Sequence, residues 1–314
     1  MKKTNVKIIP LIFAIICLIF CLTACKDKSE PLPTPTTQPE PTEEPVDVLP
    51  VDVSIDSPYV IKDAALVRNS YIHADIANFR DDGDVVIITL NLRNSSDDHA
   101  FGLILPDCVI NGCEVELAWA ESLAPSEVKR SDLLISHEML NDRGLLPIDE
   151  IVFHTVTYVQ QDDSESVPEI YLDDSVTVYP TGKTPEEISL TERPEQEGDS
   201  IVLDNDICTF IILGSQQTEA GLDLPCYIVN HADRDVTVTL ENMTVNGSPC
   251  DPGWGLSLNA DTRIYSDIVF PIALLEEANI SVDEVDSIRF TLSVYDNANW
   301  INPLVENHKF EYHA

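Results

Sequence analysis

DCVINGCEVELAWAESLAPSEVKRSDLLI, residues 107–135, recurs in altered form as NMTVNGSPCDPGWGLSLNADTRIYSDIVF, residues 242–270. At one constant offset along the chain, the aligned pairs include Asn111 with Asn246, Gly112 with Gly247, Trp119 with Trp254, Leu123 with Leu258, and Asp132 with Asp267. A fixed period in a sequence indicates one structural unit used twice. The chain is therefore predicted to carry two similar modules, residues 55–181 and residues 199–314.

Each module has the sequence pattern of β-strands. Apolar residues alternate along VVIITLNLRN (residues 85–94) and IRFTLSVYD (residues 288–296), which is typical of strands with one buried face. Asn-Gly between such runs favours a two-residue hairpin. One short helix is expected in each module, at 136–145 and at 272–280. These elements predict an all-β chain of two tandem antiparallel β-sandwich domains, immunoglobulin-like in architecture.

The order of elements is shared by both modules. A strand is followed by a polar N-x-(S/A)-D turn, a second strand, an N-G hairpin and a third strand. A short helix and a strand with the pattern D-x-I-x-F, which is D-E-I-V-F in the first module, complete the order. This order resembles a repeat module of poorly characterised lipoproteins from Gram-positive, clostridia-like bacteria. The resemblance implies immunoglobulin-type sandwiches at the cell surface. It brings no catalytic residues with it.

Residues 1–25 have the layout of an export signal. Three lysines precede an apolar run, which ends in Leu22-Thr23-Ala24-Cys25. These four residues resemble the bacterial lipobox, which implies a diacylglyceryl group on the thiol of Cys25 and removal of residues 1–24. The alternative is a membrane-spanning helix, which needs about 20 apolar residues, whereas Ile8–Ala24 offers 17 positions. We therefore expect a lipid-anchored protein on the extracytoplasmic face of the cell membrane.

Residues 25–54 are expected to form a spacer between the lipid and the first module. Seven of the twenty residues from Pro31 to Pro50 are proline, mixed with threonine and glutamate. Such a composition favours an extended polyproline conformation and cannot bury a core. Residues 182–198, also rich in glutamate and proline, are interpreted as the linker between the modules.

The charge of the chain limits its partners. The formal net charge is −37 at pH 7, and it becomes about −40 without residues 1–24, which hold three lysines and no acidic residue. Nucleic acid is excluded as a partner because phosphate binding requires basic patches. The expected partners are the membrane, through the diacylglyceryl anchor, and an envelope protein or glycan.

Five cysteines follow Cys25, and an odd number cannot all pair within one chain. They are Cys108, Cys113, Cys208, Cys226 and Cys250. No C-x-x-C motif is present, which argues against a zinc ribbon or a thioredoxin-type site. If Asn111-Gly112 is a two-residue turn, Cys108 faces Val115 and is poorly placed to bond Cys113. We expect most of these thiols to be buried, with a Cys226–Cys250 bridge as the alternative.

Candidate ligand-binding residues are few. Trp119 and Trp254 recur at equal spacing, so each either contacts a sugar or peptide or closes the end of a core. The acidic clusters at Asp81–Asp84, Asp97-Asp98, Asp162-Asp163 and Asp173-Asp174 lack the spacing of a calcium loop and are interpreted as solvated turns. No metal, no cofactor and no catalytic residue is expected: the histidines are scattered, and no nucleophile or phosphate-loop motif occurs.

These features favour a non-enzymatic surface lipoprotein whose two modules act as interaction or spacer domains. A second hypothesis is an extracytoplasmic ligand-binding subunit of a transporter or sensor. Such receptors are usually larger α/β proteins, and no alternation of strands and helices is present here. A third hypothesis, an envelope hydrolase with a degenerate site, rests on no motif.

Overall fold

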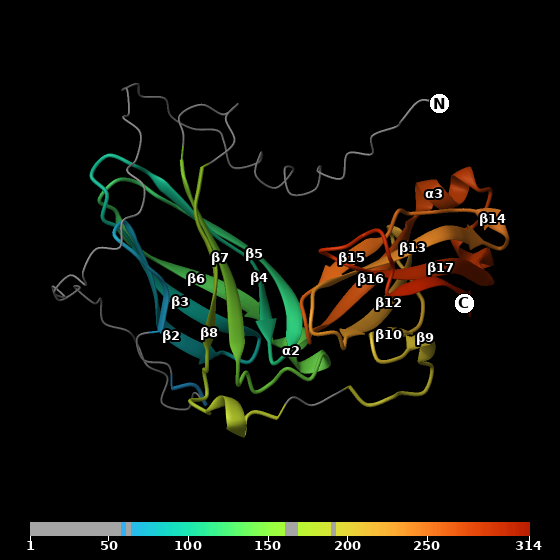
Figure 1. The fold of residues 1–314 in the computed structure, drawn as a ribbon, viewed down its shortest axis with the longest axis horizontal. Coiled ribbons are helices and arrows are strands. Elements are labelled where there is room, and N and C mark those ends of the chain that lie inside the picture. The colour runs from blue at the N-terminus through green and yellow to red at the C-terminus, as the bar shows by residue number, and fades with distance from the viewer. Residues whose placement is uncertain (1–57, 61–63, 161–168, 190–192) are drawn as a thin grey trace.

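The computed structural model describes residues 58–60, 64–160, 169–189 and 193–314. Two β-sandwiches lie side by side along the longest axis of the molecule, the first in blue to yellow-green and the second in yellow to red (Figure 1). Antiparallel strands dominate both, and each sandwich carries one short α-helix. The all-β class and the tandem arrangement predicted from the sequence are confirmed.

The first sandwich consists of two four-stranded sheets. The first of these has the order β1 (Ala64–Arg68), β2 (Ile72–Asp81), β3 (Val85–Asn94) and β6 (Val128–Ser136). The second has the order β8 (Glu169–Val178), β7 (Ile151–Val159), β4 (Phe101–Ile110) and β5 (Cys113–Leu123). The chain crosses from one sheet to the other after β3, β5 and β6, which is the connectivity of an immunoglobulin-like sandwich.

The second sandwich repeats this order strand for strand. One sheet contains β16 (Arg263–Pro271), β12 (Gly221–Asn230), β10 (Cys208–Ile212) and β9 (Ser200–Asp204), with the short β11 (Gln216–Gln217) against β12. The other contains β14 (Ser248–Pro249), β13 (Val236–Val245), β17 (Ser287–Asp296) and β18 (Val305–His313), with β15 (Gly255–Leu258) also on β13. The long β5 of the first sandwich is thus divided into β14 and β15, because Pro249 and Pro252 interrupt the strand.

Each sandwich has its own hydrophobic core. The buried apolar residues fall into two clusters, one from Tyr59 to Val178 and one from Val202 to Tyr312. Strand β7 alternates strictly between buried and half-buried residues, as a strand with one face on the core does. In β3, the residues that the alternation predicted to be buried are fully buried, namely Val86, Ile88, Leu90 and Leu92. Each such side chain contributes about 1.5–3 kcal/mol through burial.

The two Asn-Gly pairs form the predicted hairpin turns in the left-handed region. The φ angles are 48° and 76° at Asn111 and Gly112, and 51° and 81° at Asn246 and Gly247. Asn and Gly tolerate these angles best. Each asparagine also binds the start of a later strand of the same sheet, β7 or β17. Asn111 Oδ1 accepts from the amides of Asp149 and Glu150, and Asn246 Oδ1 accepts from those of Asp286 and Ser287. Asn111 and Asn246 therefore have the same structural role in the two sandwiches.

The two predicted helices are present and shorter than expected. They are α2 (His137–Asp142) and α3 (Ile272–Glu277), and each buries one leucine completely, Leu140 and Leu275. A 3-10 turn, η2 (Val282–Glu284), follows α3, and another, η1 (Pro185–Glu187), lies in the linker. Both α-helices end before a residue with positive φ, Gly144 at 65° and Asn279 at 58°, which stops helix propagation.

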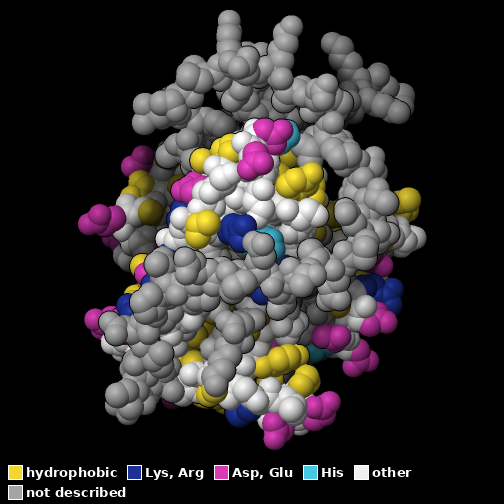
Figure 2. Space-filling view, turned by 90° about the vertical axis from the view of Figure 1, so that its left-hand side faces the viewer, with side chains coloured by type: hydrophobic (Ala, Val, Ile, Leu, Met, Phe, Trp, Pro, Cys, Tyr) yellow, Lys and Arg dark blue, Asp and Glu magenta, His cyan; other side chains and the backbone are white. Residues whose placement is uncertain are grey.

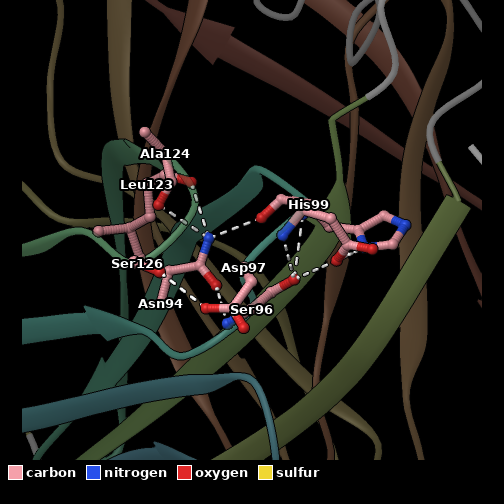
Figure 3. A network of polar contacts seen from close by, with 8 residues as sticks. Asn94, Ser96, Asp97, His99, Leu123, Ala124 and Ser126 are labelled. Atoms are coloured by element: carbon pink, nitrogen blue, oxygen red, sulfur yellow. Dashed lines mark hydrogen bonds and ion pairs between the residues drawn. The ribbon is translucent and has the colours of Figure 1, made fainter. Parts of the chain in front are cut away.

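A buried asparagine joins two loops at one end of each sandwich. In the first, Asn94 Nδ2 donates to the carbonyl oxygens of His99, Leu123 and Ala124, at 2.8, 3.2 and 2.9 Å (Figure 3). Its Oδ1 accepts from the amide of Ser96 at 2.9 Å. Since Asn94 ends a strand of one sheet and Leu123 ends a strand of the other, the side chain fixes the relative position of the sheets at this end.

The surface at one end of the molecule carries both acidic and apolar side chains (Figure 2). On the end of the molecule formed by the first sandwich, acidic side chains lie around the outline, and apolar side chains form small separate groups (Figure 2). Exposed large apolar residues of this sandwich include Val128, Leu134 and Ile170. Within the described part of the chain, no helix has the length and apolar character needed to cross a bilayer.

Candidate functional site

The two sandwiches meet along a pair of parallel strands. Cys113 pairs with Arg263 and Glu114 pairs with Ile264, so β5 and β16 join two sheets into one of nine strands. The amide of Arg263 donates to the carbonyl oxygen of Gly112 at 3.0 Å. The hairpin tip at Asn111-Gly112 ends the strand pair β4–β5 at this point and presents its backbone to the second sandwich.

Glu114 binds the loop that leads into β16. One carboxylate oxygen, Oε1, accepts from the amide of Asn259 at 2.6 Å and from the hydroxyl of Thr262 at 2.7 Å. Hydrogen bonds to a carboxylate are shorter and stronger than those between neutral groups. Because Glu114 belongs to the first sandwich and both donors to the second, this side chain fixes the junction.

Arg263 supplies the reciprocal contact from the second sandwich. It is only 9% exposed, and its Nη2 donates to the carbonyl oxygen of Asn111 at 3.1 Å. It also forms a hydrogen bond with the hydroxyl of Tyr227. Burial raises the pKa of the Cys113 thiol, and the positive charges of Arg143 and Arg263 oppose that rise. The guanidinium is therefore embedded among groups of both sandwiches.

Two tyrosines and two further arginines stack next to Arg263. The rings of Tyr227 and Tyr265 lie 4.9 Å apart, and Tyr265 also packs against the first core. The Arg143 guanidinium lies 5.3 Å from the centre of the Tyr265 ring, and that of Arg193 lies 5.9 Å from the Tyr227 ring. A cation over an aromatic face is attracted by about 0.5–2 kcal/mol.

Arg193 belongs to the segment interpreted as the linker. It forms a two-point ion pair with Asp199, with nitrogen to oxygen distances of 2.6 and 2.8 Å. The side chains are only 10% and 3% exposed. Hydrogen bonds from Arg193 hold the pKa of Asp199 below its usual value, although burial acts in the opposite direction. The end of the linker is thus attached to the second sandwich.

A groove of about 390 Å³ opens between these elements. Its polar and aromatic lining includes Asn141, Arg143, Arg193, Gln196, Arg263 and Tyr265. The residues come from three parts of the chain: the end of α2, the linker and β16. This groove is the place where charged side chains of both sandwiches converge, and we take it as the candidate functional site.

The two predicted ligand contacts, Trp119 and Trp254, lie outside this groove. Trp119, in β5, is half-buried against the first core. Trp254 is half-buried against the second core, where its ring and that of Phe210 form a T-shaped pair and its Nε1 donates to the carbonyl oxygen of Asp267 at 3.1 Å. Both pack on a core, and a ligand role for either stays a prediction.

All five described cysteines are free thiols. None is more than 2% exposed, so they pack as small apolar side chains do. Cys108 lies opposite Val115 across the hairpin, the register that the Asn-Gly turn predicted. The alternative of a Cys226–Cys250 bridge is not formed. Burial raises the pKa of Cys208 and of Cys226 to about 12, so neither thiol is an activated nucleophile.

The acidic clusters that the structure describes form turns and local ion pairs. Asp81 accepts from the amide of Gly83 and lies 3.0 Å from His137 Nδ1. Asp173 lies 2.8 Å from His154 Nε2. Within the described ranges, no group of three or more His, Cys, Asp or Glu side chains is placed to hold a metal ion. Cys25 and Asp162-Asp163 lie outside the described residues.

Neither a scan against protein-family models nor a search of curated proteins finds a match to this chain. Among solved structures, the transglutaminase of red sea bream matches with 6% sequence identity and a TM-score of 0.20. The match covers 78% of this chain and 31% of the transglutaminase chain. A likeness at this TM-score carries no inference about activity.

The groove and its three arginines were not predicted from the sequence. Arg143, Arg193 and Arg263 lie far apart along the chain and belong to no motif. One signal was available: the chain has nine arginines, so each is unusual in so acidic a protein. Nothing in the sequence places three of them together.

Proposed function

We propose that this chain is a lipid-anchored protein on the extracytoplasmic face of a cell membrane, where its two β-sandwiches act as non-enzymatic interaction or spacer modules. The observation that carries the proposal is Leu22-Thr23-Ala24-Cys25 at the end of a charged and then apolar segment. A diacylglyceryl group supplies two acyl chains, and two chains anchor a protein stably where one does so only reversibly.

The net charge supports a body that stands away from the membrane. With a charge of −37, the chain is repelled by anionic lipid headgroups, so the lipid and not the protein surface would hold it there. A proline-rich spacer after Cys25, at about 3.1 Å per residue, would hold the folded body about 70–80 Å above the bilayer. That distance suits contact with envelope material beyond the membrane.

The residues that recur in both sandwiches have structural roles, which supports a module used as an interaction or spacer domain. Asn111 and Asn246 close hairpins and bind loops, while Trp119 and Trp254 pack on the cores. The module was thus reused as a structural unit. Its loops, which differ between the two copies, are where binding specificity would reside.

The anchor is tested by growing cells with radioactive palmitate and comparing the wild type with Cys25→Ser and Cys21→Ser. Cys21 is the matched control, because it lies earlier in the same apolar segment. We expect label in the wild type and in C21S, and none in C25S. Equal labelling of C25S, or no labelling of the wild type, would refute the anchor.

The interaction role is tested separately by capture experiments. The chain from Asp27 onward is immobilised and exposed to the envelope fraction and the culture supernatant of the source organism. A protein or glycan that is retained by this chain, and not by an unrelated acidic β-sandwich, supports the proposal. If nothing binds and deletion instead impairs uptake of one nutrient, the ligand-binding subunit is the better description.

A further inference from the structure

We propose that the groove between the two sandwiches is a binding site for a small oxyanion, a molecule that carries carboxylate or phosphate groups. Three of the nine arginines of the chain line this one groove of about 390 Å³. The site is independent of the lipid anchor, so either proposal can fail without the other.

The three arginines differ in the partners that they already have within the chain. Arg193 is neutralised by Asp199, with which it forms the buried two-point pair. Arg143 makes no ion pair and no side-chain hydrogen bond among the described residues, and its guanidinium lies over the face of Tyr265. Arg143 therefore offers a guanidinium with all five N–H donors available.

Arg263 forms the floor of the groove. It is only 9% exposed and is held by the carbonyl oxygen of Asn111, so its position is fixed before any ligand arrives. A planar guanidinium matches the geometry of carboxylate and phosphate and binds both through paired hydrogen bonds. A fixed arginine beside one with open donors is a suitable arrangement for an anion that bridges the two sandwiches.

The groove also supplies neutral donors. The side-chain amides of Asn141 and Gln196 line it and make no hydrogen bonds within the described chain. One carboxylate, that of Asp142, is part of the lining, and it opposes an anion. Besides Arg193, which is paired with Asp199, two arginines, Arg143 and Arg263, line the groove with this one carboxylate.

The acidity of the rest of the chain makes this group of arginines informative. A net charge of −37 repels small anions from the surface as a whole. Saturable anion binding would therefore need a local site, and the groove is where the arginines converge. Its volume suits a molecule of the size of a tricarboxylic acid or a small phosphate ester and not a polymer.

The test is calorimetric titration of the full chain, in a non-ionic detergent at low ionic strength, with citrate and separately with inorganic phosphate. Glycerol serves as the uncharged control. We expect saturable binding of at least one anion, weakened by added sodium chloride. Whichever anion binds more tightly identifies carboxylate or phosphate as the ligand group.

Variants locate the binding in the groove. Arg143→Gln is expected to weaken affinity by about tenfold to a hundredfold, because a charge-assisted hydrogen bond is lost. Arg143→Lys keeps the charge and loses the paired N–H donors of the guanidinium. Its affinity for the anion should lie between that of Arg143→Gln and that of the wild type. Arg93→Gln is the matched control: it removes the same charge from β3, away from the groove, and should leave affinity within twofold.

Arg143 is chosen because its side chain is half-buried and makes no hydrogen bond in the described chain, so R143Q loses only the cation–π contact with Tyr265. Equal melting temperatures of R143Q and the wild type confirm that the variant is folded. The proposal is overturned if neither anion binds saturably, or if R143Q and R93Q weaken binding equally.

Discussion

Asn94 and Asn230 occupy corresponding places in the two sandwiches, where Asn94 Nδ2 donates to three carbonyl oxygens and Asn230 Nδ2 to two. Each is 1% exposed and donates from Nδ2 to backbone carbonyl oxygens, while its Oδ1 accepts from the amide two positions later. The acceptors Ala124 and Asn259 are themselves separated by the repeat offset. A buried amide thus fixes the same loop crossing twice.

Asn94→Ala and Asn230→Ala are expected to lower the free energy of unfolding by about 2–3 kcal/mol, because each leaves buried backbone groups without partners. Asn141→Ala is the control, since its amide is exposed and makes no hydrogen bond in the described chain. Urea unfolding followed by tryptophan fluorescence measures the change. A loss below about 0.5 kcal/mol in N94A and N230A, the size expected of an ordinary surface substitution, would contradict the role given to these residues.

Glu114→Ala is expected to loosen the junction. The amide of Asn259 loses its acceptor, and the hydroxyl of Thr262 keeps only the carbonyl oxygen of Asn259 as a partner. Hydrogen exchange should therefore become about tenfold faster at the amides of Asn259 and Arg263, since a hydrogen bond to a charged group is worth about 1.5–3 kcal/mol. Glu116→Ala, on the same strand and exposed, should leave both unchanged. Unaltered exchange in E114A would mean that strand pairing alone holds the sandwiches.

The five buried cysteines should resist alkylation by iodoacetamide at pH 8. Burial blocks access, and it raises the pKa of Cys208 and Cys226 to about 12, so the reactive thiolate is scarce. Peptide mass spectrometry should find all five unmodified in the native chain and all modified in urea. Val128→Cys, at a position that is 62% exposed, provides a thiol that reacts in the native state. Rapid native alkylation of Cys108 or Cys226 would show that the cores open.

His154 gives the first sandwich a pH-dependent contribution to stability. Burial lowers the pKa of its ring, but hydrogen bonds to Asp173 and Asp107 outweigh that effect and raise the pKa above its ordinary value. The stabilisation is therefore complete below about pH 6.5, the unfolded value, and is lost as the pH rises through the raised pKa. It amounts to less than about 1 kcal/mol, because the ring is 35% exposed.

This dependence is measured as the free energy of unfolding across a pH series. His154→Gln should remove the decline in the free energy of unfolding above about pH 6.5. His313→Gln, at an exposed position, should retain that decline. A decline of equal size in H154Q and the wild type would assign the dependence to other groups.

Local chemistry made much of the fold predictable. Asn111-Gly112 and Asn246-Gly247 require positive φ, and this requirement fixed both hairpins and the register that places Cys108 opposite Val115. Alternation identified the buried face of β3. The helices were predicted to be longer than they are, because the sequence pattern did not reveal that Gly144 and Asn279 adopt positive φ and end them.

The junction was not predictable for a physical reason. Only two residue pairs join β5 to β16, and the partners, such as Cys113 and Arg263, are far apart in the sequence. Neither strand carries a local pattern that distinguishes a parallel neighbour from solvent. The groove depends on that junction, so its arginines could not be brought together from sequence.

The junction unites unlike edges, β5 of one sandwich with β16 of the other, and in principle such a head-to-tail contact can be repeated into a filament. At the repeat offset, however, Pro249 stands where Glu114 stands, and Val128 stands where Arg263 stands. Proline has no N–H to donate to a neighbouring strand, and valine cannot donate side-chain hydrogen bonds as arginine does. The residues that make the junction are therefore replaced at the corresponding positions of the two outer edges, Pro249 in the second sandwich and Val128 in the first.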